Sequence, residues 1–142
     1  MSMLELFTEI YKSEPRAEKS EIDRLKIWLR NNDFPICDLP EDYIEFLEES
    51  NGGGFLKGER EYQMFSIAEI MEFYEIYSFS EFMPYALPFA MDGYGDFYLF
   101  NLRWNDNNVY RVSANNIDWE EYNSFPVASS FKNCIIKGCF RV

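Results

Sequence analysis

Carboxylates are the side chains of this sequence that are numerous enough to suggest chemistry. Asp and Glu number 25 against 13 Lys and Arg, the net charge is −12, and histidine is absent. Without an imidazole, catalytic triads, zinc sites and acid–base schemes that depend on histidine are excluded. Two carboxylates at the right separation could still hydrolyse a glycosidic bond. No neighbouring residues indicate that one carboxyl group of a pair is buried beside aromatic residues while the other is exposed. We therefore predict no catalytic residue and keep a small enzyme with a carboxylate pair as an alternative.

Two loops contain the residue types of ligand-binding loops but not their context. Residues 92–96 (DGYGD) lack EF-hand spacing and are followed by neither a lysine nor a helical pattern. Residues 51–54 (NGGG) follow a predicted helix, whereas phosphate-binding loops precede one. We interpret the first loop as a turn and the second as a helix stop. The sequence therefore predicts no cofactor and no metal.

The cysteines and the apolar segments bear on location. Cys37, Cys134 and Cys139 cannot all pair and are too few for the disulfide framework of a small secreted domain. We interpret them as buried, inert thiols in a reducing cytoplasm. Residues 1–14 have neither the basic start nor the apolar centre of a secretory signal. Since the longest nearly apolar stretch, residues 83–91, is shorter than the roughly 20 residues that cross a bilayer, we expect a cytoplasmic protein with no membrane segment.

The negative charge is confined to the middle of the chain. Residues 31–102 contain 15 acidic and two basic side chains, a local charge of −13, whereas the remainder carries +1. Glu41, Glu45 and Glu48 share one face of a predicted helix, and Glu49 is adjacent. Like charges so placed destabilise a helix by about a few tenths of a kcal/mol per pair. The face is either a solvated surface that keeps the protein soluble or an acidic surface that attracts a basic protein partner. We expect no direct binding of nucleic acid, whose phosphates such a charge repels.

Two of the three tryptophans lie in polar segments. Trp104 and Trp119 differ in this from Trp28, which lies on a predicted amphipathic helix. A tryptophan in a polar segment either covers the edge of the core or stays exposed as the anchor of a protein interface. Large apolar side chains seldom stay exposed in a monomer, which favours the first alternative. Together with the four glutamates, Trp104 and Trp119 complete the candidate partner-binding residues.

Three helices are predicted in the first part of the chain. Apolar residues recur at helical spacing in residues 3–11 and again in 22–29, with a polar break between them. A third helix begins at Pro40, because proline loses no hydrogen bond in the first turn and the carboxylates that follow favour the positive end of the helix dipole. It runs to the glycines at 52–54. The acidic face therefore lies on a helix with defined ends.

The middle of the chain combines one more helix with segments of β periodicity. Ser66 and Glu69 form a capping box that starts a fourth helix over residues 67–77. A closing helix is predicted from Ser129 onward. Together these elements predict an α+β fold in a single domain, residues 1–142, in which N-terminal, mid-chain and C-terminal helices pack on a central sheet. The sheet is antiparallel or mixed and has about four or more strands, with aromatic and β-branched segments at residues 61–65, 87–91, 97–102 and 109–112.

Short motifs in these elements follow one another in a characteristic order. They are Leu39-Pro40, Asp42-Tyr43, Phe46-Leu47, Asn51-Gly52-Gly53, Phe65, Leu87-Pro88-Phe89-Ala90, Asp92-Gly93, Gly95, Val109-Tyr110 and Ser129-Ser130-Phe131. Over about residues 22–136 this order resembles the SUKH superfamily, which includes the Smi/Knr cell-wall regulators of yeast and many bacterial proteins. The resemblance implies a single α+β domain whose motif residues are structural, with no shared catalytic residues.

The resemblance also suggests a function. Bacterial members of the superfamily are widely regarded as immunity proteins, which are encoded beside a toxin and neutralise it by binding. We therefore predict a non-enzymatic immunity protein whose partner is a cognate toxin domain with a basic surface, such as a nuclease. The alternative is an intracellular regulatory or scaffold protein that binds an endogenous protein. Neighbouring genes would discriminate between the two, because a toxin gene beside this one favours immunity.

Overall fold

One antiparallel sheet runs through the molecule. The computed structural model describes residues 2–138, apart from the side chains of residues 121 and 122. Each strand pairs antiparallel with the next one in the sequence. The strands are β1 (Glu9–Lys12), β2 (Gly53–Lys57), β3 (Arg60–Met64), β4 (Ala86–Met91), β5 (Asp96–Asn101) and β6 (Val109–Ser113). The predicted α+β class is confirmed, and of the two sheet types that were expected the antiparallel one is observed.

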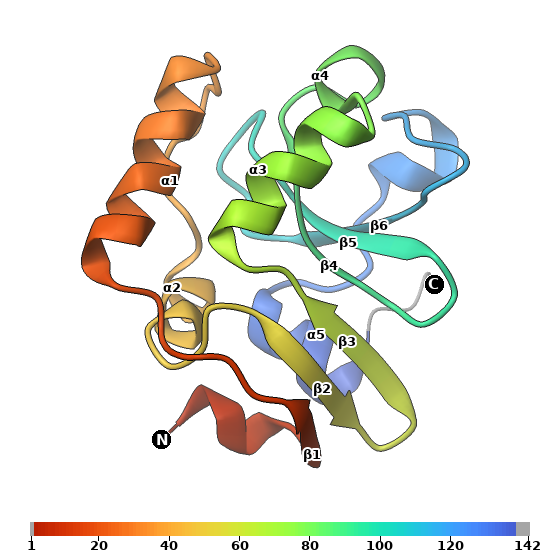
Figure 1. Cartoon of the computed structure of the whole chain (residues 1–142). Coiled ribbons are helices and arrows are strands. Elements are labelled where there is room, and N and C mark those ends of the chain that lie inside the picture. The colour runs from red at the N-terminus through yellow and green to blue at the C-terminus, as the bar shows by residue number, and fades with distance from the viewer. Residues whose placement is uncertain (1, 139–142) are drawn as a thin grey trace.

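Helices cover both faces of this sheet (Figure 1). One face carries α1 (Lys19–Asn31), α3 (Ile67–Ile76) and α4 (Phe79–Phe82), and the other carries α2 (Glu41–Leu47) and α5 (Phe131–Lys137). Two short 3-10 helices, η1 (Met3–Leu6) and η2 (Glu121–Ser124), complete the described elements.

Strand β5 shows how the core divides between the two faces. Side chains alternate across a strand, so Phe97 and Phe100 point to opposite sides. Phe97 packs on Phe79 of α4 at 5.4 Å between ring centroids. Phe100 stacks on Phe89 at 4.4 Å and packs on Tyr43 of α2 at 5.1 Å. The sheet therefore separates two aromatic clusters, of which the second fixes α2.

The sequence signals for helix ends are largely confirmed. α2 begins directly after Pro40, and α3 has the predicted capping box, in which Ser66 Oγ accepts from the Glu69 N–H and Glu69 Oε1 accepts from the Ser66 N–H. However, α2 ends at Leu47, one turn before the predicted stop. Its last turn is replaced by a tight turn in which the N–H groups of Glu49 and Ser50 bond to the Phe46 carbonyl.

The predicted helix over residues 3–11 is wrong. Only Met3–Leu6 is helical, and residues 9–12 form the edge strand β1. Met3, Leu6 and Phe7 are buried, but Ile10 and Tyr11, which complete the helical spacing, are exposed on β1. Pairing with β2 decides the conformation here, since the Thr8 N–H and hydroxyl both donate to the Leu56 carbonyl. The tertiary contact overrides the local periodicity.

The glycine run starts a strand and does not end α2, so its interpretation as a helix stop is wrong. Gly52 has the left-handed φ of +86° that was expected, but it lies in the turn between α2 and β2. The next two glycines begin β2, which the sequence did not indicate. At Gly53, φ is +119° and an added Cβ would lie 2.6 Å from the Lys12 carbonyl oxygen of β1, so β2 can start this close to β1 only with glycine at this position.

The cysteines do not all behave as expected. Cys37 is a half-buried free thiol near the Phe34 carbonyl. Cys134 is buried and disulfide-bonded, so its interpretation as an inert thiol is wrong, and the cysteines no longer argue for a reducing compartment. Cys139 lies outside the described residues.

Candidate functional site

Helix α2 places its carboxylates and its aromatic residues on opposite sides. Tyr43, Phe46 and Leu47 are buried against the sheet. Glu41, Glu45 and Glu48 are exposed, and none of them has an ion-pair partner among the described residues. We call these three side chains the α2 acidic face. The predicted face is thus present as an unneutralised charged surface.

The three members of the α2 acidic face have different surroundings. Glu48 lines a surface groove of about 400 Å³ between α1 and α2, together with Lys19 and Lys26. The positive charges of α1 partly offset that of Glu48. Glu41 and Glu45 do not line this groove. Lys19 and Lys26 are therefore expected to offset the charge of Glu48 more than that of Glu41 and Glu45.

Glu49, the fourth glutamate of the prediction, has a structural role. Its carboxylate accepts hydrogen bonds from the Ser2 hydroxyl and, at 2.7 Å, from the Met3 N–H. It thereby fastens η1 to the end of α2. A carboxylate used in this way is less available to a partner than its neighbours, and we base the candidate surface on the other three.

Trp119 covers the edge of the core, as the first alternative for the tryptophans predicted. It is half-buried, its indole N–H donates to the Pro84 carbonyl at 2.7 Å, and its ring packs edge-on against Tyr110. Trp104 is 52% exposed, and its indole N–H donates to Asp106 at 2.9 Å. Trp104 therefore keeps the geometry of an interface anchor, whereas Trp119 does not.

Arg103 joins the two tryptophans, a contact that we did not predict from the sequence. Its guanidinium lies 3.7 Å from the centre of the Trp119 ring and 4.3 Å from that of Trp104. Burial lowers the pKa of Arg103, and Asn101 Oδ1 orients the side chain by accepting from its Nε at 3.0 Å. Such cation–π contacts hold an exposed ring in one place. Trp104 is thus fixed in position before any partner arrives.

The structure does not bring the tryptophans and the α2 acidic face into one cluster. α2 contacts α5 and η1. The described polar and ring contacts of Trp104 and Trp119 are with Arg103, Asp106, Pro84 and Tyr110. No described polar or ring contact links either tryptophan to the α2 acidic face.

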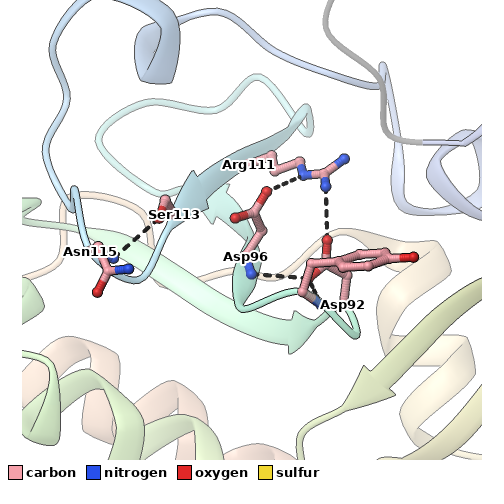
Figure 2. A network of polar contacts seen from close by, with 6 residues as sticks. Asp92, Asp96, Arg111, Ser113 and Asn115 are labelled. Carbon is pink, nitrogen blue, oxygen red and sulfur yellow. Dashed lines mark hydrogen bonds and ion pairs between the residues drawn. The ribbon is translucent and has the colours of Figure 1, made fainter.

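A second group of carboxylates lies where β4 turns into β5 (Figure 2). It borders a pocket of about 350 Å³ that also contains Tyr98 and Arg111. Arg111 forms ion pairs of 2.8 Å with both Asp92 and Asp96. The other oxygen of Asp92 accepts the N–H groups of Tyr94 and Asp96. These carboxylates hold the turn and its strand pairing, and burial raises the pKa of Tyr98 at the pocket floor.

Among residues 2–138, no cluster of histidine, cysteine, aspartate or glutamate side chains has the arrangement of a metal site. The helices of this part of the chain are also too short or too polar to cross a membrane.

A family model described as the SMI1 / KNR4 family (SUKH-1) matches residues 21–137. The chain belongs to this family. The match confirms the resemblance expected over residues 22–136. A sequence search of curated proteins found no match.

In this SUKH-1 protein the motif residues join elements to one another. Asp42 Oδ2 accepts from the Lys132 N–H at 2.9 Å, in the first turn of α5, and so links that helix to α2. Asn51 Oδ1 accepts from the Ile67 N–H at 2.9 Å, in the first turn of α3. Both contacts satisfy helix N–H groups that otherwise lack a partner. These two motif residues therefore serve the fold.

Proposed function

We propose that this SUKH-1 protein is a non-enzymatic immunity protein that acts in the cytoplasm. Its partner would be a cognate toxin domain with a basic surface, such as a nuclease. The observation that carries the proposal is the exposure of Glu41, Glu45 and Glu48 on one helix face with no neutralising partner among the described residues. Family membership adds support for a protein that works as an immunity factor or regulator.

Electrostatics favours a basic partner. The 15 acidic and two basic residues between positions 31 and 102 concentrate the net charge of −12 in one part of the sequence. A nuclease must attract phosphate, so its active surface is positive. An inhibitor with a dense negative face competes for that surface, and complementary fields raise association rates by about 10- to 1000-fold.

The polar contacts favour binding over catalysis. In the pocket beside β5, Asp92 and Asp96 are already engaged by Arg111 and by backbone N–H groups. A general acid or base must be able to reach substrate with an available oxygen or proton. Because Asp92 and Asp96 hold the turn, they offer a substrate neither an available oxygen nor a proton.

The test begins with the gene product encoded next to this protein. We expect the two proteins to form a complex when they are expressed together, and we expect this protein to relieve any growth arrest that the neighbour causes. The association rate is then measured by stopped-flow fluorescence at low ionic strength. Simultaneous reversal of Glu41, Glu45 and Glu48 to lysine should slow association at least about tenfold.

A matched control separates local charge from total charge. Reversal of Glu9, Glu59 and Glu120, which are also exposed and do not line the groove beside Glu48, to lysine changes the net charge equally but leaves the α2 acidic face intact. We expect a clearly smaller effect from this variant. If the two triple variants slow association equally, the α2 acidic face is not the docking surface. A neighbouring gene without toxic activity, together with a stable complex with an endogenous protein, would instead favour the regulatory alternative.

A further inference from the structure

A surface groove of about 450 Å³ lies between the end of α3 with α4 and the segment that follows β6. Figure 1 shows α4 and this segment at the same end of the molecule. We call it the α3–α4 groove. Its lining contains the apolar residues Ile76, Tyr77, Phe82, Ala114 and Ile117 and the polar residues Ser78, Asn115 and Asn116.

Two large apolar side chains of this groove remain in contact with solvent. Ile76 is 61% exposed and Phe82 is 54% exposed. Their neighbours are used internally, because Tyr77 packs on Phe97 at 4.9 Å and Phe79 packs on it at 5.4 Å. Tyr77 and Phe79 therefore belong to the core, whereas Ile76 and Phe82 stay outside it. Apolar side chains that lie together at a surface hollow are typical of protein interaction sites.

The walls of the groove are fixed by hydrogen bonds. On one side, the Ala114 N–H donates to the Gly95 carbonyl at 3.1 Å and the Asn116 N–H donates to the Ser113 carbonyl at 3.0 Å. Buried Asn123 donates to the Asn116 carbonyl at 3.1 Å. On the other side, the N–H of Ser78 donates to the Glu75 carbonyl at 3.0 Å. A partner would therefore meet a formed surface and lose little free energy in ordering it.

The groove is bordered by acidic residues on its helical side. Its helical wall carries the exposed residues Glu72, Glu75 and Glu81, none of which has an ion-pair partner among the described residues. Glu72 lies one helical turn before Ile76, on the same side of α3. The chain segments that form the two walls belong to residues 61–102 and 112–131, and neither range contains a lysine or arginine. Beside the other wall, Arg103 lies over the Trp119 ring. Exposed apolar side chains next to acidic residues on the helical wall are complementary to an apolar side chain flanked by positive ones.

We infer that the α3–α4 groove receives an amphipathic segment of a protein partner, with large apolar side chains on one face and lysine or arginine beside them. This inference rests on the proposed function, since it places the apolar contact of a basic partner on a surface separate from the α2 acidic face. The acidic face would then speed the encounter, and the groove would slow dissociation.

The test uses a synthetic helical peptide that has leucine along one face and lysine along the other. A second peptide carries glutamate in place of every lysine. Binding is measured by fluorescence anisotropy. Wild type should bind the lysine peptide and not the glutamate peptide, and the double variant Ile76→Ser/Phe82→Ser should weaken binding at least about tenfold.

The matched control is Ile27→Ser/Phe125→Ser, which removes two apolar side chains of similar exposure, 49% and 65%, that do not line the groove. This variant should change affinity by less than about twofold, as expected for side chains outside the contact. Methyl NMR of the wild type gives a second measurement that does not depend on the variants folding. The methyl signals of Ile76 and Ile117 should shift on binding, and those of Ile27 should not.

Several results would overturn the inference. They are no binding of the lysine peptide, equal weakening by both double variants, equal binding of the glutamate peptide, and methyl shifts confined to other isoleucines. Concentration-dependent self-association that Ile76→Ser/Phe82→Ser abolishes would assign the groove to a second copy of the chain. The proposed function fails separately, because it depends on the Glu41, Glu45 and Glu48 reversal and not on the groove variants.

Discussion

Carboxylates occur in the β4–β5 turn and on α2 in opposite situations. In the turn, Asp92 is 6% exposed and each of its oxygens accepts a hydrogen bond from Arg111 or from the backbone. On α2, Glu41 and Glu45 are exposed and no described residue pairs with them. The count of acidic residues treats these groups alike. The comparison shows that only the second group contributes charge that another molecule can use, while the first stabilises the fold.

The largest effect is expected from removing an engaged carboxylate. Asp92→Ala should lower the free energy of unfolding by about 2–4 kcal/mol, because Arg111 and two backbone N–H groups lose their acceptor in a largely buried site. Asp92→Asn should cost less, since an amide oxygen can still accept from the Tyr94 and Asp96 N–H groups. Urea denaturation followed by tryptophan fluorescence measures both.

The contrast with α2 supplies the control for this experiment. Glu41→Gln removes a carboxylate of the unpaired group, and surface substitutions of this kind change stability by no more than about 0.5 kcal/mol. If Asp92→Ala were as mild as Glu41→Gln, the network around Arg111 would not hold the turn, and the division between the two groups of carboxylates would fail.

Residues 92–96 show where prediction from the sequence succeeds and where it stops. The turn itself was predicted from its glycines and aspartates, and it is confirmed between β4 and β5. The pairing of Asp92 with Arg111 was not predicted, because it requires the register that places Tyr98 opposite Arg111 on β6. Local patterns fix turns and helix starts, whereas partners distant in sequence depend on strand pairing.

The helix prediction for the N-terminal region was wrong for the same reason. Residues 3–11 have apolar residues at helical spacing, yet residues 9–12 pair with β2. The sequence did not indicate β2, because this strand begins with two glycines. Glycine is usually depleted in strands, and here it is required at Gly53 by the positive φ and by the Lys12 carbonyl oxygen of β1. For the candidate site, exposure on α2 followed from periodicity, but the use of Glu49 by Ser2 and Met3 did not.

Glu49 lies between the two situations and should give an intermediate effect. Glu49→Ala removes the acceptor of the Ser2 hydroxyl and of the Met3 N–H at a half-buried position. We expect a loss of about 1–2 kcal/mol in the free energy of unfolding. Hydrogen exchange should locate the loss, with faster exchange in residues 3–12 and little change in β4 and β5. Uniform acceleration throughout the sheet would contradict a local role in fastening η1.

Single reversals on α2 should rank the unpaired carboxylates by their surroundings. Glu41→Lys and Glu45→Lys should each slow association with the partner about two- to fivefold at low ionic strength. Glu48→Lys should have a smaller effect, because Lys19 and Lys26 line the same groove and already weaken the negative field there. Stopped-flow rates at low and high salt measure the ranking, and all differences should shrink as salt is added. Equal effects of the three reversals would mean that the cations of α1 do not matter.

The smallest effect distinguishes a face that serves binding from one that serves the fold. Glu45 lies one turn from Glu41 and three residues from Glu48, so like charges repel along α2, and Glu45→Gln should raise the free energy of unfolding by about 0.2–0.5 kcal/mol. The gain should vanish at high salt, where exposed charges are screened, and the same substitution should slow association with a basic partner. If the replacement stabilises the protein and weakens binding, Glu45 serves binding and not the fold. A fall in stability would mean that Glu45 makes a structural contact, as Asp92 does.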